Sequence, residues 1–162
     1  MKWLKTIVLG LSLGVAHADL PLPDQAKLIG SLIASSGLNL EKVVIGIHGG
    51  DTNKRTELRN ALMNLKQLKV GAKVLPIEVR LLETNEIPAD CNVLYVFSKI
   101  DLPAERSILS FTDNRQLVES GVLAGLTREG VQPKIFMNME TLKLLGLKYP
   151  ANLLKMVTLV RN

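Results

Sequence analysis

One string in this chain has the form that hydrolases use for nucleophilic catalysis. Gly10-Leu11-Ser12-Leu13-Gly14 matches the G-x-S-x-G pattern of a serine nucleophile elbow. A working elbow needs a strand before the serine and a helix after it, so that the hydroxyl is exposed on a sharp turn. This string lies inside an apolar N-terminal segment that offers neither element, and we therefore assign it no catalytic role.

A second string, His48-Gly49-Gly50-Asp51, has the glycine-rich form of an esterase oxyanion loop. Without a usable elbow, we interpret it as a turn between a strand and a helix, in which the glycines permit positive φ and Asp51 or Thr52 caps the helix. His48 is the only histidine after residue 18 and Cys91 is the only cysteine, which is too few ligands for a zinc site unless carboxylates contribute. The phosphate-loop patterns are also absent. The sequence predicts no enzyme, no metal site and no cofactor, with a secreted hydrolase using His48 kept as a minor alternative.

The first 18 residues predict export. Lys2 and Lys5 precede an uncharged apolar run, and Ala16-His17-Ala18 has the small-x-small form of a signal peptidase site. The alternative is an uncleaved anchor or a buried N-terminal helix. We expect residues 1–18 to be a signal peptide, residues 19–162 to form a single domain, and the mature protein to be periplasmic.

The charge and cysteine content narrow the function further. The chain has 20 Lys and Arg against 15 Asp and Glu, without a basic run, so a nucleic-acid partner is not expected. Cys91 cannot form an internal disulfide, and its position before an apolar run indicates a small core side chain. The fold must therefore depend on its hydrophobic core.

Hydrophobic periodicity predicts an alternation of helices and strands. We expect helices at 24–35, 53–68, 101–106, 115–119, 140–145 and 151–160, and strands at 42–47, 75–81, 93–97, 107–112, 122–127 and 134–137. Asp24 is the expected cap of the first helix, and Pro76 predicts an edge position for the second strand. The fold class is α/β: a three-layer sandwich with a mixed, largely parallel central sheet and helices on both faces.

Polar residues follow several of the expected strands. In an open parallel sheet, a ligand binds at the carboxyl ends of the strands, which here brings together the segments 48–52, 98–99 and 113–114. His48, Asp51, Asp113 and Asn114 are therefore candidates for ligand or partner binding.

An ordered set of features resembles the YfiR-like family of periplasmic regulatory proteins. Cys91 leads into the apolar strand 93–97, the stretch 110–114 has a strand ending in a Ser-Asp type turn, and Gly121 precedes Leu123. The run 134–138 is followed by Gly146-Leu147 and Leu153-Leu154. The resemblance covers about residues 28–160.

The resemblance implies an exported, non-catalytic protein that binds and restrains a membrane-anchored partner from the periplasmic side. That partner would be an inner-membrane sensor with a periplasmic domain, a diguanylate cyclase or a sensor kinase, with cyclic di-GMP and biofilm formation as the regulated output. Two features depart from the family: the segment 97–107 is shorter than the helix usual there, and Cys91 alone excludes gating by an internal disulfide.

Several positions and alternatives stay open at this point. Asn138, in the family-like ending, is a candidate binding residue, although an Asn at a strand end also caps a following helix. Exposed apolar contacts to a partner would come from Leu20, Leu22, Leu147 and Tyr149. The competing function is a small periplasmic solute-binding protein, and a small-molecule ligand and a homodimer are both compatible with the sequence.

Overall fold

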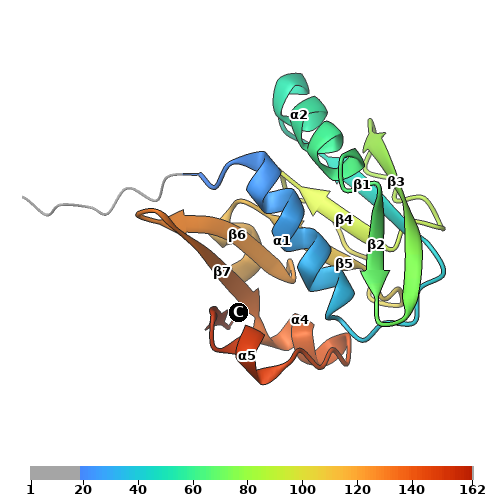
Figure 1. The fold of residues 1–162 in the computed structure, drawn as a ribbon. Helices are drawn as coiled ribbons and strands as arrows, with labels where there is room; N and C mark the ends of the chain where they lie inside the picture. The colour runs from blue at the N-terminus through green and yellow to red at the C-terminus, as the bar shows by residue number, and fades with distance from the viewer. Residues whose placement is uncertain (1–18, 162) are drawn as a thin grey trace, which may run out of the picture.

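The computed structural model describes residues 19–161, and in this part of the chain eight strands form one sheet in the order β2-β3-β1-β4-β5-β6-β7-β8 (Figure 1). The predicted signal peptide and the Gly10 to Gly14 string lie outside the described residues. The strands are β1 Val43–His48, β2 Gln67–Val70, β3 Lys73–Leu82, β4 Val93–Val96, β5 Leu109–Thr112, β6 Ala124–Glu129, β7 Gln132–Asn138 and β8 Val157–Val160.

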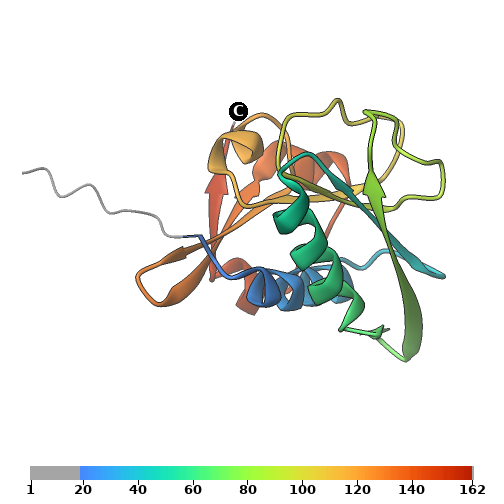
Figure 2. The same cartoon turned by 90° about the horizontal axis from the view of Figure 1, so that it is seen from above.

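The sheet is mixed and largely parallel, as predicted. β3, β1, β4, β5 and β6 run parallel to one another, β7 returns antiparallel to β6, and β8 lies parallel to β7. Turning the molecule shows α1 (Leu22–Ala34) and α2 (Thr52–Met63) on one face, with α3 (Arg115–Glu119) and α4 (Met139–Leu144) on the other (Figure 2). The three-layer α/β sandwich is therefore confirmed.

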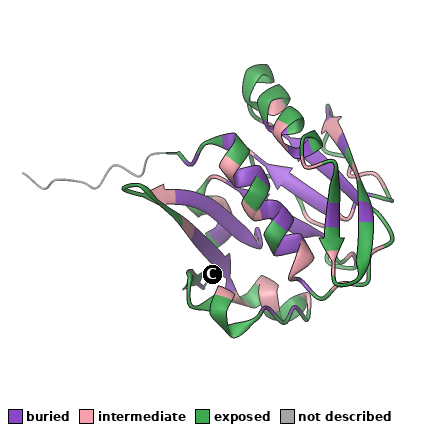
Figure 3. Ribbon diagram, viewed as in Figure 1, coloured by how far each residue is buried: buried purple, intermediate pink, exposed green. Residues whose placement is uncertain are grey.

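The middle of the sheet is buried on both sides (Figure 3). Every residue of β1, β4 and β5 is buried, which matches the continuous apolar runs that predicted covered strands. Ile29, Ile33 and Leu32 of α1 complete the larger core on one face. Leu94, Val96 and neighbouring side chains form a smaller core on the other face.

Two helix expectations near the N-terminus are corrected. α1 begins at Leu22 after Pro21, without a side-chain cap, so Asp24 lies in the first turn instead of capping it. α2 ends at Met63, five residues earlier than expected; Lys66 then adopts a φ of 60°, and the chain enters β2. The helical spacing of Leu62, Leu65 and Leu68 suggested that the helix extends to residue 68. Leu68 is instead buried from strand β2, which follows a turn.

The predicted edge position of the strand that carries Pro76 is also corrected, because β3 has a neighbour on each side. β2 pairs with Lys73 to Pro76, whereas β1 pairs with Ile77 to Leu82. The two partners cover different halves of β3, and Pro76 lies where one partner ends and the other begins. A residue without a backbone N–H is tolerated at such a junction.

The C-terminal helix expected at 151–160 is divided between α5 (Ala151–Leu154) and the strand β8. The segment 157–160 contains two valines and a threonine, which favour extended backbone, and β7 offers it a free edge. The helix expected at 101–106 is only a turn at Ala104 and Glu105. The connection between β4 and β5 is therefore a loop.

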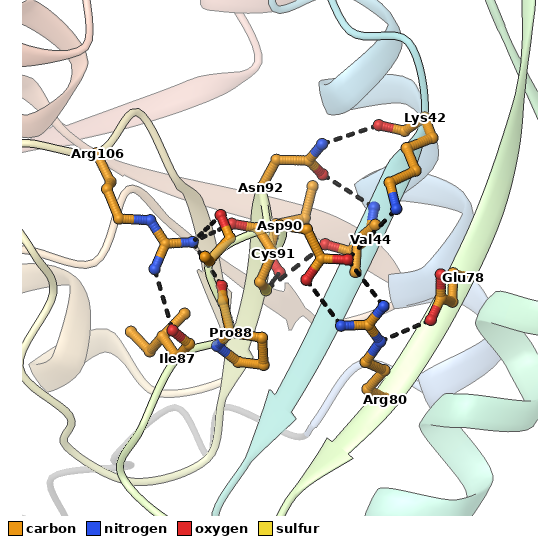
Figure 4. Close-up of polar contacts among 12 residues, drawn as sticks. Lys42, Val44, Glu78, Arg80, Ile87, Pro88, Asp90, Cys91, Asn92 and Arg106 are labelled. Atoms are coloured by element: carbon orange, nitrogen blue, oxygen red, sulfur yellow. Dashed lines mark hydrogen bonds and ion pairs between the residues drawn. The ribbon is translucent and has the colours of Figure 1, made fainter.

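Arg106, in the loop before β5, holds the segment that leads into β4. Arg106 donates from Nη1 to the carbonyl of Ile87 at 3.1 Å, and from Nη2 to those of Pro88 at 2.7 Å, Ala89 at 3.2 Å and Cys91 at 2.7 Å (Figure 4). The segment before β4 is neither helix nor strand, so its carbonyls need donors beyond the backbone bond from the Cys91 amide to the Pro88 carbonyl at 3.0 Å. Arg106 supplies them from the loop before β5.

A second group of contacts surrounds Asp90 on the same segment (Figure 4). Arg80 donates to both carboxylate oxygens of Asp90 at 2.8 and 2.9 Å, and Lys42 lies 3.3 Å away. The hydrogen bonds from Arg80 lower the pKa of Asp90 to about 2. Asn92 ties the start of β4 to β1 by accepting from the Val44 amide and donating to the Lys42 carbonyl.

Cys91 is enclosed between these contacts. Its thiol is buried and lies 3.0 Å from the carbonyl oxygen of Val93, and burial raises its pKa. The side chain belongs to the smaller core, in agreement with the expectation of a small core residue.

Replacing Arg106 by alanine is expected to lower the free energy of unfolding by about 2 kcal/mol, because the carbonyls of Ile87, Pro88, Ala89 and Cys91 lose the hydrogen bonds that Arg106 donates. Arg106→Lys should recover only part of this, since one ammonium cannot reproduce the fork of the guanidinium. Urea denaturation measures both. Lys69→Ala, at an exposed site, is the control and should change stability by less than about 0.5 kcal/mol; an equally small effect of Arg106→Ala would contradict the role assigned here.

Asn138 caps α4 and is fully buried. Its Oδ1 accepts from the amides of Glu140 at 3.0 Å and Thr141 at 2.9 Å, while Nδ2 donates to the Val118 carbonyl at 2.7 Å. The side chain thus joins the end of β7 to the beginning of α4 and to the end of α3.

Asn138→Ala should destabilise the protein by about 3 kcal/mol, because a cap is lost and the buried Val118 carbonyl loses a donor. The matched control is Asn114→Ala, which removes the exposed cap of α3 and should cost about 1 kcal/mol or less. Thermal and urea unfolding of the two variants would show the difference. Equal losses would indicate that the contact with Val118 contributes nothing.

Candidate functional site

The carboxyl ends of β1, β4 and β5 meet at one edge of the sheet, where the sequence placed the candidate site. From β1 the chain crosses to β3 on one side, and then returns to β4 on the other side of β1. The topological switch point of this parallel sheet therefore lies between β1 and β4, the position at which ligands commonly bind in open α/β sheets.

Close packing fills that switch point. Gly49 and Gly50 have φ values of 71° and 77°, and they lie against Ser98 and Phe97 at the end of β4. A Cβ on Gly50 would come within 2.8 Å of the Phe97 ring. The Phe97 amide also donates to the His48 carbonyl at 2.9 Å. The two glycines thus allow the ends of β1 and β4 to touch.

His48 and Asp51 lie at this edge but face different environments. The His48 side chain is buried, and its Nδ1 has no hydrogen-bond partner among the residues that the structure describes. Asp51 is exposed and caps α2, accepting from the Lys54 amide at 2.9 Å. The strand-to-helix turn interpreted from the sequence is confirmed, with Asp51 as the cap.

A hollow of about 310 Å³ lies beside this edge and brings two of the candidates together. It is lined by Asp19, Lys54, Asp113, Asn114, Arg115, Thr127 and Phe136. Burial raises the pKa of the Asp113 carboxyl, the nearby Asp19 raises it further, and Lys54 acts in the opposite direction. Asn114 accepts from the Gln116 amide at 2.9 Å and so caps α3.

Five of the seven side chains that line this hollow were not candidates from the sequence: Asp19, Lys54, Arg115, Thr127 and Phe136. The Arg115 guanidinium lies 4.9 Å from the Phe136 ring centroid, within cation–π distance. Thr127 has a buried hydroxyl that finds no partner among the described residues. Alternation along β7 could have placed Phe136 and Lys134 on one face, but the approach of α3 to β7 is a tertiary contact that periodicity does not show.

Asn138 does not join the other candidates. β7 runs antiparallel to β6, so its carboxyl end lies at the opposite edge of the sheet from Asp113 and Asn114. The structure brings Asp113 and Asn114 to one hollow, leaves His48 and Asp51 nearby on the same edge, and separates Asn138 from all four.

The hollow at this edge brings charged, polar and aromatic side chains together. No group of three or more His, Cys, Asp or Glu side chains among residues 19–161 could hold a metal ion. The hollow offers carboxylates from Asp19 and Asp113, cations from Lys54 and Arg115, and one aromatic ring. Such a set can recognise a small polar or charged group.

The apolar side chains expected to face a partner are buried instead. Leu20, Leu22, Leu147 and Tyr149 are 4 to 9% exposed and belong to the larger core. Gln25 helps to bury the N-terminal segment, because it donates to the Leu20 carbonyl at 2.8 Å and accepts from the Tyr95 hydroxyl at 2.6 Å.

Large apolar side chains are exposed at other places. They are Met63, Val74, Val131, Leu144, Leu154, Met156 and Leu159. Three of them, Leu154, Met156 and Leu159, fall within eight residues of the C-terminus, on α5, on β8 and between them.

None of the helices in the described part of the chain is long and apolar enough to cross a membrane.

Comparisons with known proteins give a family and a fold. No curated protein matches the chain in sequence. Among the solved structures, the chain is similar to one titled "conserved domain protein" from Vibrio cholerae O1 biovar El Tor strain N16961, with 13% identity and a TM-score of 0.52. The match covers 90% of this chain but 62% of that one, so the chain spans less than two thirds of its length. The likeness supports the α/β fold.

A family model settles the membership that the ordered features from Cys91 onward predicted. It matches residues 35–158, which reach from the end of α1 to β8 and include the carboxyl edge, the loop held by Arg106 and the cap at Asn138. The chain belongs to the YfiR/HmsC-like family.

Proposed function

We propose that this protein is exported through its leader and acts in the periplasm as a non-catalytic regulator, which binds and restrains a membrane-anchored diguanylate cyclase. The family match over residues 35–158 carries this proposal, since the family is one of periplasmic regulators of such signalling enzymes. The leader-like residues 1–18 support export. A sensor kinase is the alternative partner.

The outer edge of β8 is the surface that we assign to the partner. β8 is the last strand of the sheet, pairs only with β7, and leaves its other side without a strand in the described chain. Open edges of this kind accept an extended segment from another protein through backbone hydrogen bonds. Met156 and Leu159 are exposed here and would supply apolar contact.

The opposite edge of the sheet is protected in a way that β8 is not. β2 has exposed Gln67 and Lys69, and Lys66 directly precedes it. Lysines on an edge strand discourage pairing with another chain. In the described part of the chain, the β8 edge combines unpaired backbone with two exposed large apolar side chains, Met156 and Leu159.

The partner itself can be identified by capture. Purified protein, used as bait on detergent-solubilised envelope from the same organism, should retain an inner-membrane protein with a periplasmic domain and a cyclase domain. Retention of a sensor kinase would favour the alternative partner, and retention of outer-membrane lipoproteins alone would contradict the proposal.

Leu159→Lys should weaken binding to the periplasmic domain of the captured cyclase by at least about tenfold, because a charge is placed in the apolar contact. Cyclic di-GMP should rise in cells that export the variant in place of the native protein. Val131→Lys is the matched control, since Val131 is 93% exposed at the β6–β7 hairpin and lies away from β8. Equal affinities of the two variants would exclude the β8 edge.

The carboxyl edge makes a separate prediction about pH. The folded-state pKa of Asp113 is raised, so ionisation of Asp113 costs stability above its unfolded pKa of about 3.9, and this cost disappears as the pH falls below that value. Asp113→Asn should therefore be more stable than the native protein at pH about 7 and no more stable at pH about 3. Urea unfolding at the two pH values measures this. A variant that is less stable at neutral pH would show that the carboxylate is stabilised by its surroundings.

A further inference from the structure

The β4–β5 loop leaves a second hollow on the face opposite α1. This loop, residues 97–108, contains a turn where a parallel crossover commonly has a helix. A cavity of about 320 Å³ lies between the loop and the segment from α3 to α4. It is separate from the polar hollow at the carboxyl edge, with which it shares no lining residue.

Apolar side chains form most of this cavity. Ile108 and Val122 are buried members of the smaller core, and Leu102 and Leu117 pack against them. Leu144 of α4 also lines the cavity but is 72% exposed. An apolar molecule in the cavity would cover Leu144 and remove this surface from water, which is favourable.

The side chains that line the cavity carry more positive than negative charge. Lys99, Arg106 and Asp101 line it. Arg106 directs its donors at uncharged carbonyl groups, and Lys99 is exposed and forms no ion pair with any carboxylate in residues 19–161. Two cations and one carboxylate leave a net positive charge, which favours an anionic group on the occupant.

We propose that this cavity binds a small, mainly apolar organic anion. Its apolar body lies against Ile108, Val122 and Leu144, and its charged group lies near Lys99. The volume is at the lower end of the range of about 300–1,000 Å³ for small-molecule sites, which suits a ligand of the size of a medium-chain carboxylate. The site belongs to the isolated protein, so its test does not depend on the partner proposed above.

Decanoate and decanol are suitable probes, because they share an apolar chain and differ in the charge of the head group. Titration of the purified full chain by calorimetry, with methyl NMR of the leucines and isoleucines, should show decanoate binding more tightly than decanol. The methyl signals of Leu144 and Ile108 should shift.

Two surface variants test the position and the charge separately. Ala104→Trp, at an exposed residue of the cavity wall, should fill the cavity and weaken both probes at least tenfold. Lys99→Glu should weaken decanoate about tenfold and leave decanol unchanged. Lys69→Glu, an exposed lysine on β2, is the charge-matched control and should affect neither probe.

Each contrary result overturns a stated part of the proposal. Absence of decanoate binding, or binding that Ala104→Trp does not weaken, excludes the cavity as the site. Equal effects of Lys99→Glu and Lys69→Glu exclude recognition of the anionic group. If decanoate does not bind and Ala104→Trp instead abolishes self-association in sedimentation, the occupant is a second copy of the chain and not a small molecule.

Discussion

Both faces of the central strands must be covered, because every residue of β1, β4 and β5 is buried. α1 and α2 meet this requirement on one face. On the other face, α3 and α4 are short, and the β4–β5 connection contributes no helix. The cover there depends on irregular backbone, whose carbonyls need donors. Arg106 supplies four such hydrogen bonds and so helps to hold the segment before β4 against the smaller core.

Because the central strands are covered on both faces, the hollows in which a ligand could bind lie at the periphery of the sheet. A ligand cannot enter between β1 and β4, because Gly49 and Gly50 let the strand ends close on Ser98 and Phe97. Polar recognition is then possible beside the carboxyl edge, where Asp113 is only partly covered. Apolar recognition is possible where the loop of residues 97–108 fails to cover the smaller core. Both hollows follow from how the sheet is covered.

The sequence predicted well those elements whose apolar residues directly indicate which side chains are buried. The apolar run 93–97 gave β4, and the strands expected at 122–127 and 134–137 correspond to the antiparallel pair β6 and β7. The misassigned elements have apolar patterns that a helix and a strand can bury equally well. Leu68 is buried from a strand instead of a helix. Residues 157–160 form a strand because β7 lies beside them. Asp113 and Asn114 could be predicted from their place after a strand. Thr127 and Arg115 could not, since a cross-strand neighbour and a packed helix bring them to the hollow.

The two ends of the sheet differ in a way that bears on regulation. A solitary domain gains by protecting its edge strands, and the lysines at β2 do so. β8 instead keeps its backbone open beside Met156 and Leu159, at a cost in exposed apolar area. The pairing with another protein proposed above would use this open edge and cover these side chains. The regulator proposed above would act by contact, and an open edge strand beside exposed apolar side chains is the kind of surface that such contact requires.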